Sequence, residues 1–172
     1  MRKIILLGYM GCGKSTIANR LSKSTGIPFV DLDKSIEERT NLSINEIFEQ
    51  KGELYFRKLE REVLLELLQS PETLIIGLGG GTPCYANNHE LLKGEGVFSI
   101  YLKAAVATLV DRLVSNNSKR PLIADKSEDE IKEFVAKHLF ERSFYYNQAQ
   151  HILSIEGRTK DETVTDILEI LA

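Results

Sequence analysis

The chain has 172 residues, of which 42% are hydrophobic and 27% charged. This is the balance of an ordinary globular protein, and we expect one domain spanning 1–172. The formal net charge of −3 argues against non-specific attraction to nucleic acid or to an anionic membrane. No apolar run approaches the ~20 residues that a membrane-spanning helix needs, and the run in "MRKIILLG" leads directly into a glycine-rich segment. We therefore expect a cytoplasmic protein with neither nucleic-acid nor membrane partners.

Apolar, β-branched runs alternate with segments of helical periodicity along the chain. The predicted strands cover 3–8, 28–33, 73–79, 97–102 and 151–155. The predicted helices cover 15–25, 52–70, 104–114, 128–146 and 160–171. This alternation predicts an α/β fold with a parallel sheet of about five strands, covered by helices on both faces. The polar stretch 115–130 is either a flexible connector or a lid, and the basic pair Lys119-Arg120 within it favours a lid.

The segment "GYMGCGKS" (8–15) directly follows the first predicted strand. It satisfies G-x4-G-K-[ST], in which glycines let the backbone curl so that successive N–H groups point at phosphate oxygens. Lys14 can reach the β- and γ-phosphates of a nucleotide, and Ser15 can offer its hydroxyl to Mg²⁺. The helix that begins here adds the positive end of its dipole. The strand–loop–helix context therefore favours phosphate binding over a simple glycine turn.

Two aspartates, Asp31 and Asp33, end the second predicted strand. Residues two apart on a strand point to the same side, so we expect both carboxylates to face the cleft beyond the strand ends. One can hold Mg²⁺ through water while the other orients a substrate hydroxyl or accepts its proton. A helix N-cap is the competing structural interpretation for either residue. The pair behind a phosphate loop favours the functional interpretation.

Three consecutive glycines, Gly79 to Gly81, follow the third predicted strand. A tight turn explains one or two of them, whereas close approach of the backbone to a ligand explains all three. Arg57, with Glu60 three residues further on, has the spacing of an ordinary ion pair on a helix surface. Arg142 likewise fits a solvated helix face. Neither arginine stands out without a family pattern.

Taken in order, "GYMGCGKS", "DLD", "GELYFRKLE", "LGGGTP", "KRPL" and "ERSFYY" resemble the shikimate kinases over essentially the whole chain. The resemblance implies a three-layer α/β/α P-loop kinase fold with a five-stranded parallel sheet in the order 2-3-1-4-5. It also implies substrate-binding helices at about 34–68 and a mobile lid at about 114–126. The implied reaction transfers the γ-phosphate of ATP to the 3-hydroxyl of shikimate, on the route to chorismate and the aromatic amino acids. The implied enzyme is a monomer that uses one Mg²⁺ ion per subunit.

The resemblance also implies roles for individual residues. The cradle for the ATP phosphates would comprise Gly11, Cys12, Gly13, Lys14, Ser15 and Thr16, with Ser15 on Mg²⁺ and Asp31 supporting the metal through water. Asp33 would bind the ring hydroxyls and act as the base. Arg57 and Arg142 would grip the shikimate carboxylate, Glu60 would hold Arg57, and the backbone surface against the substrate would be Gly79, Gly80 and Gly81. Arg120 would reach the ATP phosphates when the lid closes, and Arg112 and Arg158 would contact the adenine.

The chain departs from the family pattern at two places. Gly77-Leu78 stands where a serine or threonine is common, and Cys12 stands where serine or alanine is commoner.

Two alternative functions stay open. A different small-molecule kinase of the same fold, acting on gluconate or a nucleoside monophosphate, is disfavoured by the paired arginines and the triple glycine. A nucleotide-dependent switch is disfavoured because the sequence has no N-K-x-D motif for reading guanine.

Overall fold

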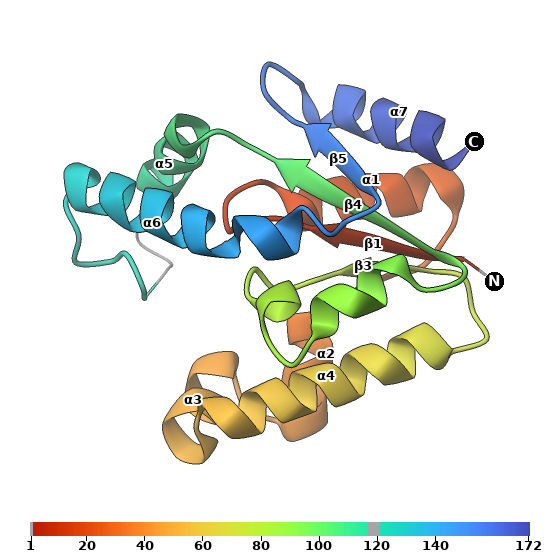
Figure 1. The fold of residues 1–172 in the computed structure, drawn as a ribbon, viewed down its shortest axis with the longest axis horizontal. Helices are drawn as coiled ribbons and strands as arrows, with labels where there is room; N and C mark the ends of the chain where they lie inside the picture. Colours follow the sequence, from red (N-terminus) through yellow and green to blue (C-terminus); the bar gives the residue numbers. More distant parts are fainter. Residues whose placement is uncertain (1, 117–120) are drawn as a thin grey trace.

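A computed structural model describes residues 2–116 and 121–172. Its centre is one five-stranded parallel sheet in the order β2-β3-β1-β4-β5 (Figure 1). The strands are β1 (Lys3–Leu7), β2 (Phe29–Asp31), β3 (Leu74–Gly77), β4 (Val97–Lys103) and β5 (His151–Ser154). The α/β fold and the strand order expected from the sequence are thus confirmed.

The middle strand, β1, explains why the apolar runs are continuous. It pairs with β3 through Ile5↔Ile76 and with β4 through Ile5↔Ser99. All of its residues are buried, because helices cover both faces of the sheet. The chain therefore leaves the centre of the sheet at Leu7 and enters the phosphate loop at the carboxyl edge, where ligands bind in folds of this type.

Seven α-helices are present among residues 2–116 and 121–172. They are α1 (Lys14–Thr25), α2 (Leu32–Thr40), α3 (Ile44–Lys51), α4 (Glu53–Gln69), α5 (Val106–Ser115), α6 (Glu128–Tyr146) and α7 (Lys160–Leu171). Two short 3₁₀ helices, η1 (Thr82–Cys84) and η2 (Asn88–Lys93), follow β3. Helix α1 packs against α7, α5 against α6, and α4 against both α2 and α3. Figure 1 shows α2, α3 and α4 gathered on the side of the sheet where β3 lies.

The second strand is shorter than the sequence predicts. Strand β2 ends at Asp31, and Asp33 lies in the first turn of α2. The reason is the Asp31 carboxylate, whose Oδ1 accepts a hydrogen bond of 3.2 Å from the Lys34 N–H and so caps the helix. The prediction that both aspartates lie on one strand was wrong. Asp31 both caps α2 and lines the same cavity as the phosphate loop.

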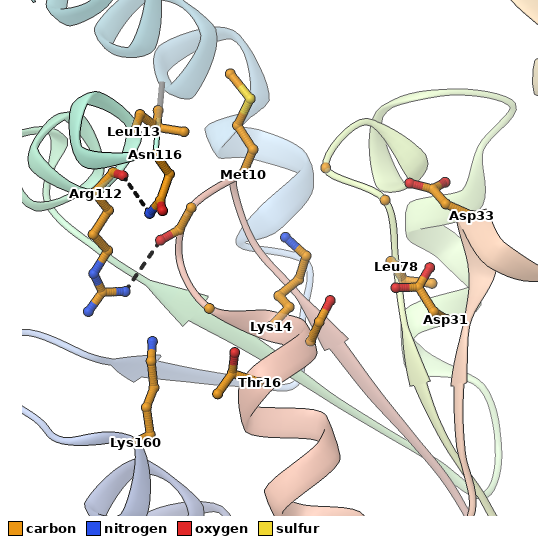
Figure 2. A pocket seen from close by; sticks show the side chains of 15 residues that line it. Met10, Lys14, Thr16, Asp31, Asp33, Leu78, Arg112, Leu113, Asn116 and Lys160 are labelled. Atoms are coloured by element: carbon orange, nitrogen blue, oxygen red, sulfur yellow. Dashed lines mark hydrogen bonds between the residues drawn. The ribbon is translucent and has the colours of Figure 1, made fainter. Parts of the chain in front are cut away.

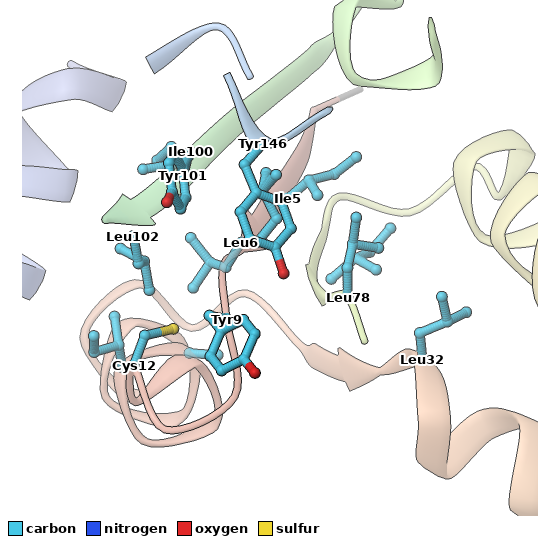
Figure 3. Packing of buried hydrophobic residues seen from close by; sticks show 14 of the residues in the cluster. Ile5, Leu6, Tyr9, Cys12, Leu32, Leu78, Ile100, Tyr101, Leu102 and Tyr146 are labelled. Carbon is cyan, nitrogen blue, oxygen red and sulfur yellow. The ribbon is translucent and has the colours of Figure 1, made fainter. Parts of the chain in front are cut away.

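The back of the phosphate loop is anchored in the hydrophobic core. Tyr9 and Cys12 are almost completely buried, beside Leu102 of β4 and Tyr146 of α6 (Figure 3). A loop fixed by its own side chains keeps its backbone geometry without a ligand. Among residues 2–116 and 121–172, no helix combines the length and apolar character needed to cross a membrane.

Candidate active site

Two adjoining cavities open at the carboxyl edge of the sheet. The loop cavity, about 710 Å³, is lined by the phosphate loop, both aspartates and residues of α5 and α7. The arginine cavity, about 580 Å³, is lined by α3, α4 and α6, including Arg57 and Arg142. Of the described residues, four line both cavities: Met10, Asp33, Gly79 and Gly80. A ligand in one cavity therefore meets a ligand in the other beside Asp33.

The start of α1 is built to receive an anion. Gly13, the N-cap residue, has a φ of 93° and offers no side-chain cap, and the first turn contains no acidic residue. The exposed end of the helix dipole thus has no carboxylate to offset it. The Lys14 ammonium donates hydrogen bonds to the carbonyls of Gly8 (2.7 Å) and Tyr9 (3.2 Å). It lies folded against its own loop, with both aspartates across the cavity (Figure 2).

Asp33 lies at the boundary of the two cavities. Burial raises the pKa of its carboxyl group to about 6, and the negative charges of Asp31 and Glu60 contribute to the rise, whereas Lys14 opposes it. A Cβ atom on Gly79 would lie 3.0 Å from Asp33 Oδ1. The carboxyl group is therefore packed tightly against the glycine backbone and tuned toward the pH range in which a general base operates.

Arg57 is held by contacts on several sides. Its Nη1 donates to Glu60 Oε1 at 2.9 Å, and Glu60 is buried, with its Oε2 accepting from the Thr82 hydroxyl at 2.8 Å. The guanidinium carbon lies 3.7 Å from the centre of the Tyr85 ring. The ion pair with Glu60 has the predicted helix spacing, but it is largely buried instead of solvated. Such an arginine keeps one orientation, which suits it to a planar carboxylate.

Arg142 enters the arginine cavity from α6. Its Nη1 lies 3.5 Å from the hydroxyl oxygen of Tyr146, which donates a hydrogen bond of 2.6 Å to the Gly80 carbonyl. The guanidinium carbon lies 5.6 Å from the centre of the Tyr9 ring. The Tyr9 hydroxyl lies 3.1 Å from Nδ1 of His138, which precedes Arg142 by one turn on α6. These contacts fix the arginine against the same glycine backbone that Asp33 touches.

The triple glycine brings the three predicted side chains together. A Cβ atom on Gly79 would lie 3.0 Å from Asp33 Oδ1, one on Gly80 would lie 3.1 Å from Arg142 Nη1, and one on Gly81 would lie 3.0 Å from Arg57 Nη2. Each glycine thus makes room for a different charged group. Any larger side chain would require a neighbour to shift.

The arginines predicted to contact the nucleotide lie in different places. Arg112 lines the loop cavity and donates to the carbonyls of Gly11 (3.3 Å) and Cys12 (3.1 Å). Arg158 does not line that cavity, and its Nε lies 3.4 Å from Asp166 Oδ2 on α7. Lys160, two residues further on, does line it. Arg120, the predicted lid arginine, lies outside the described residues.

Sequence reasoning missed Lys160 and His138. Lys160 follows a capping threonine at a helix start, and His138 lies on a helix rich in charges, so both read as ordinary surface residues. The one available signal was position: Lys160 follows the last strand, at the same edge of the sheet as the phosphate loop.

A phosphate loop opening the first helix, with a carboxyl group and two fixed arginines around the adjoining cavity, defines a P-loop kinase of a small acidic molecule. The comparisons with known proteins agree. A sequence model of shikimate kinase matches residues 10–172. The shikimate kinase of Flavobacterium johnsoniae is 70% identical over the full length of both chains.

Solved structures give the same result. The crystal structure of the shikimate kinase from Bacteroides thetaiotaomicron superposes with a TM-score of 0.91 at 34% identity, covering 99% of this chain and 98% of that one. The shikimate kinase from Acinetobacter baumannii in complex with shikimate superposes with a TM-score of 0.86 at 31% identity, covering 99% and 93%. The chain belongs to the shikimate kinase family, and it is an ATP-dependent phosphotransferase acting on a hydroxyl of shikimate.

Proposed function

We propose that the loop cavity holds ATP and the arginine cavity holds shikimate, so that phosphoryl transfer takes place beside Asp33. The single observation that carries this assignment is the shared wall: Asp33, Gly79 and Gly80 line both cavities. In phosphoryl transfer the protein contributes mainly positioning and charge neutralisation. The shared boundary, with the Asp33 carboxyl group on it, would position the two substrates next to each other.

The arginine cavity has the residues that suit the acceptor, a ring that carries a carboxylate. The guanidinium groups of Arg57 and Arg142 would bind the shikimate carboxylate, each as a planar fork. The backbone of Gly79, Gly80 and Gly81 would pass under the ring, since no side chain intervenes there. Asp33 would then hold the 3-hydroxyl, aim its oxygen at the γ-phosphorus and accept its proton as the new bond forms.

The donor end uses the phosphate loop. The N–H groups of Gly11 to Thr16 at the start of α1 would bind the phosphate oxygens, and Lys14 would leave the carbonyls of Gly8 and Tyr9 to pair with the β- and γ-phosphates. Lys14 thereby neutralises charge on the group that is transferred.

A magnesium site fits the same cavity. Ser15 and Asp31 both line the loop cavity and offer oxygen atoms, the donors that Mg²⁺ prefers. In the described part of the chain, no group of three or more His, Cys, Asp or Glu residues forms a dedicated metal site. Mg²⁺ commonly takes few protein ligands and several phosphate and water oxygens. Ser15 directly, and Asp31 through water, would hold Mg²⁺, which supplies positive charge to the phosphates.

The segment at about 114–126 would close the site. Pro121 and Leu122, at the described end of this segment, line the arginine cavity, which supports a role for the segment at the proposed acceptor site. On closure Arg120 would reach the ATP phosphates, and the segment would exclude water as a competing acceptor. Arg120→Ala should therefore lower kcat more than it lowers ATP affinity.

The described residues of one chain line both cavities, so we propose that the enzyme works as a monomer. We also propose a cytoplasmic location, as expected from the sequence. Sedimentation velocity checks the first of these assignments. A single sedimenting species of about 19 kDa supports it, because the chain mass is 19.4 kDa.

A coupled assay of ADP release tests the proposed function. ATP, Mg²⁺ and shikimate should give steady ADP release, and the blank without acceptor should give almost none. Gluconate and nucleoside monophosphates serve as the competing acceptors. ADP release that is independent of any acceptor, or supported better by gluconate than by shikimate, would contradict the proposal.

A further inference from the structure

Lys160 extends from the start of α7 to the phosphate loop. Its side chain lies over Gly13: a Cβ atom on that glycine would overlap the Lys160 ammonium and would lie 3.1 Å from Lys160 Cε. The same point lies 3.8 Å from Arg112 Nη1. Figure 2 shows both cations on the side of the loop away from Asp33. The glycine at position 13 thus leaves space for a lysine from another helix.

The charge of Lys160 has no partner in the part of the chain that the structure describes. No carboxylate there lies within 4.0 Å of its ammonium group, and that group makes no hydrogen bond there. The acids of its own helical turn are engaged elsewhere. Asp161 pairs with Arg20 at 2.7 Å, and Glu162 accepts from the Thr159 N–H at 2.7 Å. Arg112, the nearest cation, faces carbonyls of the loop.

This position is unfavourable for a cation in the free protein. Burial lowers the pKa of Lys160, and the neighbouring Arg112 lowers it further. As the first residue of α7, the lysine also lies at the positive end of a helix dipole. A polyanion bound in the loop cavity would offset all three effects at once, since it brings negative charge to both cations and to the helix end.

We propose that Lys160 binds an oxygen of the α-phosphate of the donor nucleotide. The inference rests on the proposed placement of ATP in the loop cavity. The γ-phosphate must face Asp33, whereas Lys160 and Arg112 lie on the opposite side of the loop (Figure 2). Lys14 serves the β- and γ-phosphates, so Lys160 takes the phosphate nearest the nucleoside. A lysine ammonium binds a phosphate as a point charge, whereas a contact with the uncharged nucleoside would gain little from that charge.

Displacement of a fluorescent ADP derivative tests the inference. ADP, AMP and adenosine compete in turn on the wild type, Lys160→Ala and Lys160→Arg. Loss of one charge-assisted contact should weaken both ADP and AMP on the order of tenfold in Lys160→Ala. Adenosine, which carries no phosphate, should keep its affinity. Lys160→Arg should recover most of the loss. Lys23→Ala removes an exposed lysine at the far end of α1 and should leave all three affinities unchanged.

Thermal unfolding separates binding from structure. Lys160→Ala removes a cation from a helix N-terminus, so its Tm without nucleotide should equal or exceed that of the wild type. Equal weakening of adenosine and ADP, unchanged AMP affinity, or a lowered Tm would overturn the inference. A wild type that binds no ADP would instead overturn the proposed function. The two failures are therefore distinguishable.

Discussion

The two cavities differ in how their cations are held. In the arginine cavity, Arg57 is bonded to the buried Glu60 and stacked on Tyr85, and Arg142 lies against Tyr146 and Tyr9. In the loop cavity, Lys14 donates to loop carbonyls, which it would leave to bind phosphate under the proposed function. Lys160 there meets no carboxylate within the described part of the chain.

This difference indicates that the two substrates would be bound in different ways. The proposed acceptor site, the arginine cavity, is formed in advance, so little side-chain ordering would remain when shikimate binds. The proposed donor site is a set of cations and helix N–H groups that would gain its main stabilisation from a bound polyphosphate. Substitutions around Asp33 test the junction of the two cavities, and substitutions at the arginines test the preformed half.

The largest expected effect is at the junction. Asp33→Asn keeps the shape of the side chain but removes the group that accepts the proton, so kcat should fall on the order of a thousandfold. ATP affinity, measured by displacement of a fluorescent nucleotide, should change little. A variant that retains more than about a tenth of the wild-type kcat would contradict the assigned role.

The next effect is on acceptor binding alone. Arg57→Ala removes a charge-assisted contact, so the KM for shikimate should rise about 10- to 100-fold while the ATP affinity stays nearly intact. Arg57→Lys should recover only part of the loss, because an ammonium cannot reproduce the planar fork. Glu53→Gln is the matched control. Glu53 lies 3.7 Å from Arg57 Nε but is largely exposed, so its loss should change the KM less than about threefold.

The pKa of Asp33 predicts a pH-dependent cost in stability. The carboxyl group has a pKa of about 6 in the folded protein, against roughly 3.9 in the unfolded chain. The folded state therefore binds the proton more tightly, and its stability is greatest below the unfolded pKa and declines as the pH rises to about 6. Ionisation should cost roughly 1–3 kcal/mol at neutral pH.

Denaturant unfolding of the wild type and Asp33→Asn from pH 4 to 8 measures this cost. The variant carries no titrating carboxyl group at position 33, so it should gain stability relative to the wild type between pH 4 and 6 and then hold a constant advantage. A difference between the two proteins that does not vary with pH would show that the pKa is not raised.

The smallest predicted effect on the KM for shikimate comes from the triple glycine, Gly79 to Gly81. In Gly81→Ala, the new Cβ atom would lie 3.0 Å from Arg57 Nη2 and displace the guanidinium slightly. The KM for shikimate should rise about a few-fold, because the displaced guanidinium would meet the carboxylate less well, with kcat and ATP affinity preserved.

Gly52→Ala is a useful contrast for stability, because Gly52 has a φ of 86° and no atom within 4 Å of the added Cβ. It should destabilise the protein through backbone strain alone.

The sequence predicted the fold through elements with strong periodicity. Strand β1 and the start of α1 after the glycine-rich loop were predicted correctly, because both depend on local residue types. The boundary of β2 was wrong because a side chain, Asp31, decides where α2 begins. That competition depends on a hydrogen bond that periodicity does not reveal.

The site was predicted less completely than the fold. Arg57 and Arg142 were indistinguishable from surface charges until a family pattern assigned them, since their burial depends on partners far along the chain, such as Thr82 and Tyr146. The need for three glycines became clear only when each was found against a different charged group. Lys160 was missed because a lysine after a helix cap is ordinary until the facing loop is known.

Calorimetric titration of the nucleotide-free protein with shikimate tests the central contrast most directly. If the arginine cavity is preformed, shikimate should bind saturably without ATP, with a Kd within about tenfold of its KM at saturating ATP, and Arg142→Ala should abolish the binding. Shikimate that binds only after ADP or ATP has been added would contradict this account, because the acceptor site would then depend on the donor for its assembly.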